Sequence, residues 1–451
     1  MYITDFKILE KLLRPYTIAN IYHFMPLNGF SIDSRTIVAG NGFIALQGKH
    51  HDGHQYIAHA IAQGARFVIA QREFHSTQRV PYFLVEDSYR ALAVLSRYAI
   101  KAKRPYVYAI TGSVGKTTTK EMLAFLLEAN GPVLKNYKTE NNILGVAKTC
   151  FSLRDEKTVV LELGTNAPGE IRMLADIVVP DTGIITFIKP VHLEGLGSMR
   201  GIFEEKISLF DVNARMRAIL NRDDAYLRKV TRRGAIRWFG KHKNSDLGAR
   251  GVSCDTSSST FLVQNEFKLT LRTPFGGFIY NALAAILSAH QAGMPLAQCV
   301  ERLNDFSEFP SQRAQCTHDK GFFIFNDAYN ANPYSFLEAL RVVRRYPSKK
   351  IAVVGDMREL GSRSVAYHQA LARHILRVGF ESCFALGEHA PYLVEELKKH
   401  GYRNAFCCAS HEEIAASINQ RAHPGWLIFL KGSRATQLEK VLAHLDCKNK
   451  S

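Results

Sequence analysis

The chain has 451 residues, which is too long for one ordinary hydrophobic core and favours three domains. Its 58 lysines and arginines outnumber 41 aspartates and glutamates, and the formal charge of +17 suits nucleic acid, an anionic membrane surface or small phosphorylated substrates. The basic residues are scattered in short groups, so the charge selects none of these partners and is typical of a solvated surface.

The cysteines and the apolar runs bound the cellular setting. The eight cysteines form no C-x-x-C pair and no repeated spacing, which argues against a zinc site or a disulfide framework and favours a reducing cytosol. No uninterrupted apolar run approaches the roughly 18 residues needed to span a bilayer. We therefore expect a cytoplasmic protein with no membrane insertion.

The first two thirds of the chain show two α/β patterns in succession. Residues 1–103 carry short strand-like runs such as GFIAL (42–46), separated by helical patterns. From residue 104 to 318, strand candidates such as YVYAIT (106–111) alternate with helices, which predicts a parallel sheet covered by helices. The polar segment and alternating run at 241–273 interrupt this rhythm and predict a small antiparallel excursion.

The last third resumes the alternation. Beyond Gly321 four apolar strands, beginning with FFIFND (322–327), are each followed by a helical pattern. This indicates a further α/β domain over residues 319–451.

The strongest local signal is the stretch TGSVGKTT (111–118). A strand ends there, two glycines allow backbone N–H groups to turn toward an anion, and a helix begins with its positive dipole end at the same point. Lys116 can reach terminal phosphates, and the Thr117 hydroxyl is placed to ligate Mg²⁺. Ile110 stands where the common loop has a glycine, so this loop is shorter than usual. Thr119, beyond the loop, is expected on the helix surface.

Two further residues are candidates from position alone. Glu162 ends the apolar run VVLE, where a carboxylate is costly unless it is paired or metal-bound. His192 follows another strand, on the rim where parallel sheets bind ligands. Read by themselves, a structural glutamate and a polar loop histidine stay open as alternatives.

A series of motifs resembles the Mur ligase family in order along the chain. They are the phosphate loop, NNILGV (141–146), LELGTNAPGEI (161–171), HLEGLGS (192–198), NDAYNANPYS (326–335), GDMRELG (355–361) and LKGSR (430–434). The resemblance extends from DSR (33–35) to KGSR (431–434), so it covers nearly the whole chain.

The resemblance implies a fold and an activity. The fold would be α/β with three domains: a small UDP-sugar-binding domain (1–103), a central P-loop ATPase-type parallel sheet (104–318) and a C-terminal Rossmann-like domain (319–451). The activity would be ATP- and Mg²⁺-dependent joining of D-alanyl-D-alanine to the free carboxylate of UDP-N-acetylmuramoyl-tripeptide through an acyl phosphate. The partners would be these small molecules, with no nucleic acid, and the protein would be a monomer.

The same resemblance assigns roles to residues. For ATP they are Gly112, Ser113, Val114, Gly115, Lys116, Thr117, Thr118, Asn281, Arg313 and Asp327. For metal they are Thr117, Glu162, His192 and Lys206, and for catalysis Lys116, Glu162, His192, Lys206 and Arg313. For the remaining substrates they are Ser34, Arg35, Asp52, Gly53, Asn141, Asn142, Asn330, Asn332, Asp356, Lys431 and Arg434.

Lys206 carries the most specific implication, because the family has a lysine carbamylated by CO₂ at this place. An ammonium near Mg²⁺ would repel the ion, whereas a carbamate is an anion. The chain departs from the family pattern at KPVH (189–192), SQR (311–313) and FIYN (278–281), although the metal and ATP positions themselves match.

Three alternatives remain at this point. The first is another amide ligase of the same type, adding the third residue or resembling a folylpolyglutamate ligase. The second is a basic P-loop ATPase acting on nucleic acid, although VVLELG lacks the Asp-Glu pair expected of such a motor. The third is a catalytically weakened binding protein, suggested by the departures from the family pattern.

Overall fold

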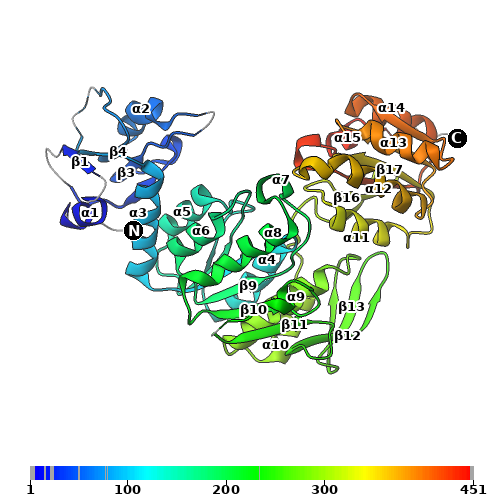
Figure 1. The fold of residues 1–451 in the computed structure, drawn as a ribbon, viewed down its shortest axis with the longest axis horizontal. Helices are drawn as coiled ribbons and strands as arrows, with labels where there is room; N and C mark the ends of the chain where they lie inside the picture. Colours follow the sequence, from blue (N-terminus) through cyan, green and yellow to red (C-terminus); the bar gives the residue numbers. More distant parts are fainter. Residues whose placement is uncertain are drawn as a thin grey trace.

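The computed structural model describes residues 6–14, 17–20, 25–48, 51–76, 78, 80–232 and 234–446. Three α/β bodies follow one another along the longest axis of the molecule, with the N-terminal body at one end and the C-terminal body at the other (Figure 1). Each body has its own sheet. The three-domain α/β organisation expected from the sequence is confirmed.

The N-terminal body contains a five-stranded sheet in the order β1-β5-β4-β3-β2. Its strands are β1 (Thr17–Asn20), β2 (Gly29–Ser31), β3 (Asn41–Ile44), β4 (Phe67–Ala70) and β5 (Tyr82–Val85), of which only β1 and β5 pair antiparallel. Helices α1 (Phe6–Leu13) and α3 (Ser88–Lys103) pack on one face of the sheet, and α2 (Ile57–Ala62) packs on the other.

The central body contains a nine-stranded sheet in the order β14-β13-β12-β11-β10-β9-β6-β8-β7. Its strands are β6 (Tyr106–Thr111), β7 (Val133–Lys135), β8 (Thr158–Glu162), β9 (Thr182–Ile185), β10 (Arg217–Asn221), β11 (Ile236–Gly240), β12 (Leu247–Cys254), β13 (Ser259–Val263) and β14 (Phe267–Leu271). Along this order, neighbouring strands from β12 through β6 to β7 pair in parallel. Strand β13 pairs antiparallel with both β12 and β14. The antiparallel excursion predicted for 241–273 is therefore confirmed, and it extends the sheet.

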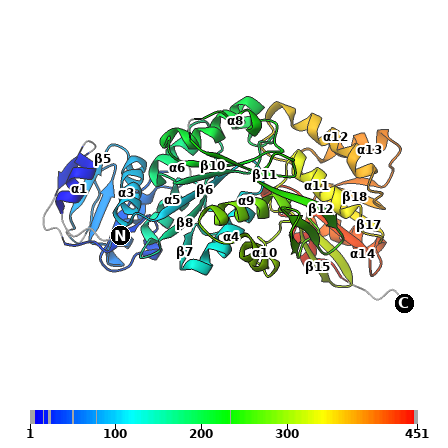
Figure 2. The same cartoon turned by 90° about the horizontal axis from the view of Figure 1, so that it is seen from below.

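Helices cover both faces of the central sheet because the side chains of its strands alternate between two apolar clusters. One face carries α4 (Lys116–Leu127), α9 (Phe278–Gln291) and α10 (Leu296–Asn304). The other carries α5 (Ile143–Ser152), α6 (Glu170–Val178) and α8 (Met199–Ile207), joined by the end of α3. Figure 2 shows β6, β8 and β10 between α6 and α8 on one side and α4 and α10 on the other. A short helix, α7 (Leu193–Leu196), precedes α8.

The C-terminal body contains a six-stranded sheet in the order β15-β16-β20-β17-β18-β19, antiparallel only between β15 and β16. Its strands are β15 (Gln315–Asp319), β16 (Phe322–Asp327), β17 (Lys350–Gly355), β18 (Ser382–Leu386), β19 (Ala405–Cys408) and β20 (Leu427–Lys431). Its helices are α11 (Pro333–Val343), α12 (Ser364–Leu376), α13 (Ala390–Lys399), α14 (His411–Arg421) and α15 (Lys440–Ala443).

Two strands of this body lie outside the predicted set. Both β15 and β19 are edge strands: β15 is exposed along its whole length and has no apolar run, and the apolar run of β19 is only four residues long. Because β15 pairs with β16, the C-terminal sheet begins at Gln315, a few residues before the boundary placed at 319.

The cysteines and helices of the described part of the chain bear on the expected setting. All seven cysteines within the described ranges are free, and Cys447 lies outside those ranges. None of the described helices is both long enough and apolar enough to cross a bilayer.

Candidate functional site

The turn between β6 and α4 has the geometry of a phosphate-binding loop. Gly112 and Gly115 adopt φ values of 144° and 87°, in the region that favours glycine. A Cβ at Gly115 would lie 2.4 Å from the Asn281 Oδ1, so the loop approaches α9 too closely for any other residue. The N-terminus of α4 and the loop N–H groups therefore meet at one point, as anion binding requires.

The segment after β9 holds this loop in place. The Ser113 N–H donates to the Phe187 carbonyl (2.8 Å), and the Ser113 hydroxyl donates to the Lys189 carbonyl (2.9 Å). The Thr186 hydroxyl donates to the Val114 carbonyl at 2.6 Å. The loop is thus fixed by neighbours distant in sequence rather than by its own turn alone.

Lys116 is partly buried at the first position of α4. Its Nζ donates to the Gly112 carbonyl at 3.0 Å, so the side chain folds back over the loop. Burial lowers the pKa of Lys116, and the nearby Glu162 carboxylate opposes this effect.

Glu162 lies at the carboxyl end of β8 with only 1% of its surface exposed. Its Oε2 accepts the Thr117 hydroxyl at 2.7 Å, and its Oε1 accepts the Asn141 side-chain N–H at 2.7 Å. The structure thus brings Glu162 and Thr117 into contact, and their shared metal-binding role stays a prediction. A carboxylate and a hydroxyl beside a phosphate loop are hard oxygen donors, which fit Mg²⁺.

The first turns of α4 correct one expectation. Thr119 was expected on the helix surface, but Thr119 and Lys120 are both fully buried. The reason is that α4 packs against the sheet and α9 on one side, while the Lys120 side chain reaches the turn that follows β7.

Lys206 lies on α8, with 1% of its surface exposed, and its Nζ makes no hydrogen bond to any described residue. Burial, reinforced by the positive charge of Lys116, lowers the pKa of Lys206 to about 7, and Glu205 opposes this. The Glu205 carboxylate cannot pair with it directly, because it accepts the N–H groups of Gly169 (2.6 Å) and Ile171 (2.8 Å) at the start of α6.

His192 stands at the contact between the central and C-terminal bodies. It adopts a left-handed backbone (φ 53°) immediately before α7, and its Nδ1 lies against the Glu359 carboxylate. The Glu194 N–H donates to the Glu359 carbonyl at 3.2 Å. The hydrogen bond with His192 lowers the pKa of Glu359, and Lys116 contributes in the same direction. Glu359 therefore brings a C-terminal carboxylate to the phosphate loop.

The phosphate loop opens into a narrow pocket of about 110 Å³ between the central and C-terminal bodies. The site residues named in the sequence analysis that line this pocket are Ser113, Val114, Gly115, Lys116, Thr118, Asn281, Arg313, Asp327, Asn330, Asn332 and Lys431. Five aromatic residues to which the sequence analysis gave no role also line it: Phe187, Phe275, Phe278, Tyr329 and Tyr334. Aromatic faces of this kind suit the stacking of a nucleotide base.

Polar contacts fix the C-terminal side of this pocket. Lys431, fully buried, forms an ion pair with the Asp327 carboxylate and donates to the Asn330 carbonyl at 3.2 Å. The Arg313 guanidinium lies 4.6 Å from the centre of the Tyr329 ring. The positively charged side chains of Arg313, Lys431 and Lys116 thus line the same pocket.

Asp356 and Arg434, predicted to bind substrate, line neither this pocket nor the one described next. Asp356 is 2% exposed and accepts the backbone N–H groups of residues 388–389. It lies beside two histidines within metal-binding distance, but His368 Nε2 accepts the Met357 N–H at 2.9 Å. Arg434 donates to Gln312 Oε1 at 3.1 Å. These contacts favour structural roles for both residues.

A second, wider pocket of about 1000 Å³ lies between the N-terminal and central bodies, and we call it the N-terminal pocket. Ser34, Arg35, Gly53 and Asn142, all predicted to bind substrate, line it. Asp52 lies beside it and accepts the His54 N–H at 3.0 Å. Asn141 does not line it, because its side chain bonds Glu162 instead.

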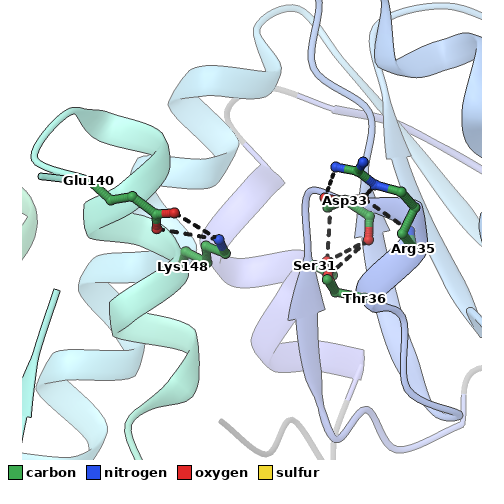
Figure 3. A network of polar contacts seen from close by, with 6 residues as sticks. All are labelled: Ser31, Asp33, Arg35, Thr36, Glu140 and Lys148. Carbon is green, nitrogen blue, oxygen red and sulfur yellow. Dashed lines mark hydrogen bonds and ion pairs between the residues drawn. The ribbon is translucent and has the colours of Figure 1, made fainter. Parts of the chain in front are cut away.

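Figure 3 shows two polar groups of the N-terminal pocket facing each other. On one side, Arg35 donates to the Asp33 carboxylate through Nε (2.9 Å) and Nη2 (2.7 Å). On the other, Lys148 of α5 pairs with Glu140 at 3.2 Å. The hydrogen bonds from Arg35 lower the pKa of Asp33. The sequence analysis missed Asp33, Glu140 and Lys148, although DSR and the residues flanking NNILGV contain them.

Family models match the chain over three successive ranges. The Mur ligase family catalytic domain matches residues 26–130, the Mur ligase middle domain residues 110–289, and the Mur ligase glutamate ligase domain residues 312–434. These ranges follow the order of the three bodies.

Individual relatives resemble the chain over nearly its whole length. The UDP-N-acetylmuramoyl-tripeptide–D-alanyl-D-alanine ligase of Treponema pallidum is 31% identical and covers 92% of this chain and 93% of its own. A crystal structure of MurF from Acinetobacter baumannii has a TM-score of 0.88 at 27% identity, covering 97% of this chain and 98% of its own. MurF from Thermotoga maritima, crystallised in complex with ADP, has a TM-score of 0.82 at 29% identity, covering 92% and 96%.

Proposed function

The chain belongs to the Mur ligase family, and from this premise we propose that it joins D-alanyl-D-alanine to the free carboxylate of UDP-N-acetylmuramoyl-tripeptide at the expense of ATP. This is a step in the synthesis of peptidoglycan precursors. The observation that carries the proposal is the phosphate loop, which has Glu162 and Thr117 buried beside it and which lines the narrow pocket together with Arg313 and Asp327. A relative of the same fold binds ADP.

The narrow pocket supports the first chemical step. The tripeptide carboxylate attacks the γ-phosphate of ATP, and the product is an acyl phosphate and ADP. Lys116 and Arg313 both line the pocket and would neutralise charge on the transferring group. Thr117 and Glu162, with His192 as a further ligand, would hold Mg²⁺, which would supply further charge neutralisation at the phosphates.

The second step needs no covalent bond to the protein. The amine of D-alanyl-D-alanine attacks the acyl carbonyl, and the tetrahedral intermediate expels phosphate. We call the phosphate loop together with Thr117, Glu162 and Lys206 the phosphate centre. Water must be kept from the acyl phosphate. The C-terminal body already contributes Glu359, which contacts His192, and Tyr329, which lines the narrow pocket. We therefore assign to this body the role of closing the site.

Lys206 suits the carbamate that the family resemblance implies. Reaction of a lysine with CO₂ requires the neutral amine and releases one proton, leaving an anion in place of a cation. Burial lowers the pKa of Lys206 to about 7, so a large fraction of the amine is neutral at physiological pH. The resulting anion would face the positive charge of Lys116 instead of repelling it.

The N-terminal pocket suits the UDP-linked substrate. It is wide, it contains Arg35 and Lys148 for phosphate contacts, and it begins where α5 presents its N-terminus, capped by Asn142. Asn141 and Asn142 follow one another between the two pockets, so a substrate seated here would extend its peptide toward Glu162. We further propose that the protein acts as a monomer in the cytoplasm.

The test is a phosphate-release assay with purified protein. Phosphate should appear only when ATP, UDP-N-acetylmuramoyl-tripeptide and D-alanyl-D-alanine are all present. Replacing the tripeptide substrate by UDP-N-acetylmuramoyl-dipeptide with a free diamino acid tests the sibling activity. Release that instead depends on DNA or RNA would overturn the ligase proposal.

A further inference from the structure

Lys120 is a buried cation that the proposed chemistry does not use. It follows Lys116 by one turn of α4 and is fully buried. Its Nζ donates to the carbonyls of Asn136 (2.7 Å) and Lys138 (2.6 Å) and lies 3.0 Å from Glu121 Oε1. All three ammonium donors therefore have acceptors, and two of these belong to the turn that follows β7.

This turn, residues 136–142, holds the main chain of Glu162. The Asn136 side chain accepts the Glu162 N–H at 2.9 Å and donates to the Glu162 carbonyl at 3.0 Å. It also donates to the Glu140 carbonyl at 2.8 Å, which closes the turn on itself. One asparagine thus fixes both the end of β8 and the shape of the turn.

The same turn also holds the Glu162 side chain. Asn141 donates to Oε1, the oxygen that Thr117 leaves free, and the Gly164 N–H donates to the Asn141 carbonyl at 2.9 Å. Lys138, one of the residues bound to Lys120, has a left-handed backbone (φ 46°) that a lysine adopts only where its surroundings impose it. The Lys120 ammonium binds the carbonyls of Asn136 and Lys138 and so holds this strained position.

The turn reaches both pockets as well. Thr139 makes a hydroxyl contact with Tyr329 of the C-terminal body, and Tyr329 packs on Arg313. Glu140 and Asn142 line the N-terminal pocket. The shape of the 136–142 turn therefore affects both the narrow pocket and the N-terminal pocket.

We propose that Lys120 is a positioning residue for the phosphate centre: its buried ammonium clamps the 136–142 turn, and two of the turn's asparagines, Asn136 and Asn141, orient Glu162 toward the metal position beside Thr117. Lys120 touches no substrate in this scheme and acts through Asn136 and Asn141. The inference rests on the proposed use of Mg²⁺ with ATP.

Removal of the charged group should distort the turn rather than simply loosen the core. A methionine at this position would fill a similar volume but leave the buried Asn136 carbonyl and the partly buried Lys138 carbonyl without this donor. These carbonyls would turn toward other donors or water, and the side chain of Asn141 would move with them.

The experiment measures ADP binding by calorimetry in Mg²⁺ and in EDTA, without any ligase substrate. For Lys120→Met, ADP affinity in EDTA should stay within about twofold of the parent, whereas the tightening caused by Mg²⁺ should fall by about 10- to 100-fold, as for other groups that orient metal ligands. Because no peptide bond is formed, the result does not depend on which amide the enzyme makes.

Lys135→Met is the matched control. Lys135 pairs with the same Glu121 at 2.6 Å, but it makes no contact with the 136–142 turn among the described hydrogen bonds and ion pairs. Its loss should leave the Mg²⁺ effect unchanged. Should Lys120→Met fail to fold, Lys120→Gln, which keeps two N–H donors, replaces it and should show a smaller loss of the same kind.

Two outcomes would overturn the inference. One is a lower midpoint of thermal unfolding together with an unchanged Mg²⁺ effect, which would make Lys120 a purely structural residue. The other is an equal loss in Lys135→Met, which would assign the effect to Glu121. A protein that binds Mg²⁺ and ADP normally yet forms no amide would contradict the ligase proposal while leaving Lys120 in its role.

Discussion

The phosphate centre and the N-terminal pocket are built in opposite ways. In the phosphate centre, Thr117, Glu162 and Lys206 are each at most 3% exposed, and the centre is held by contacts between residues far apart in the chain. In the N-terminal pocket, the side chains of Arg35 and Lys148 are 82% and 53% exposed, and each pairs with an acid a few residues away. One region is preorganised by packing, and the other is assembled from exposed side chains on the surface.

This difference predicts how each region tolerates change. Buried, mutually bonded groups lose several interactions when one of them is removed, and their low-dielectric surroundings strengthen each interaction. Exposed pairs are screened by water and salt, so each contributes little. Substitutions in the phosphate centre should therefore lower kcat strongly, whereas those in the N-terminal pocket should weaken substrate binding only moderately.

Lys116→Met tests the largest expected effect. Removal of the cation that folds over the loop should lower kcat by about 100- to 1000-fold, because the charge on the transferring phosphoryl group loses a preorganised partner. Single-turnover phosphate release measures this, and calorimetry with the UDP-linked substrate should show unchanged affinity. A rate within about tenfold of the parent would contradict the role of Lys116.

Lys206→Ala should lower kcat by about 10- to 100-fold, the range found for groups that orient a metal. If a carbamate is the active group, acetate or formate should restore part of the rate by supplying a carboxylate in the space left by the side chain. Lys116→Met provides the control, since a carboxylate cannot replace a missing cation. An undiminished rate for Lys206→Ala would remove this residue from the mechanism.

The pH dependence of reactivation by CO₂ is a second test of a carbamate at Lys206. Burial lowers the pKa of Lys206 to about 7, so its reactive neutral form becomes predominant as pH rises through 7 and is lost as pH falls below it. Enzyme stripped of CO₂ should therefore recover activity faster per unit of dissolved CO₂ at pH 8 than at pH 6. Recovery rates that do not change with pH would exclude Lys206 as the site of CO₂ uptake.

Lys148→Ala should give the smallest effect. Loss of one exposed cation in the N-terminal pocket should raise KM for the UDP-linked substrate by up to about fivefold and leave kcat unchanged, as expected for a screened charge pair. Lys157→Ala, an exposed lysine outside both pockets, is the control. A large fall in kcat would mean that the two regions are not built as differently as their burial indicates.

The local motifs made part of the phosphate centre recognisable from the sequence. Glycines at 112 and 115, with Lys116 and Thr117 opening a helix, encode the backbone conformation of the loop locally, although distant segments hold the loop in place. Glu162 could be recognised because a carboxylate at the end of an apolar strand needs a partner. The loop residues and Glu162 could thus be recognised from their immediate neighbours in the sequence.

Other residues could not be placed in this way. Asn141 and Asn142 are adjacent and received the same predicted role, yet one binds Glu162 and the other caps α5. Thr119 was expected on a surface, and Lys120 received no role, because a helix periodicity does not show which neighbour covers each face. The aromatic lining of the narrow pocket comes from three separate segments, and although Tyr329 and Tyr334 lie within the motif at 326–335, nothing in the sequence shows that these segments meet.

The sequence by itself determined the three α/β domains, their order, the phosphate loop and, through its motifs, the family. Local propensity and short-range spacing suffice for these features. The tertiary structure alone decided that the charge of Lys116 helps to lower the pKa of Lys206, that Glu359 meets His192, and that Lys120 clamps the turn behind Glu162. Burial and hydrogen bonding between distant segments set these relations, and a linear pattern does not record which distant segments the fold brings together.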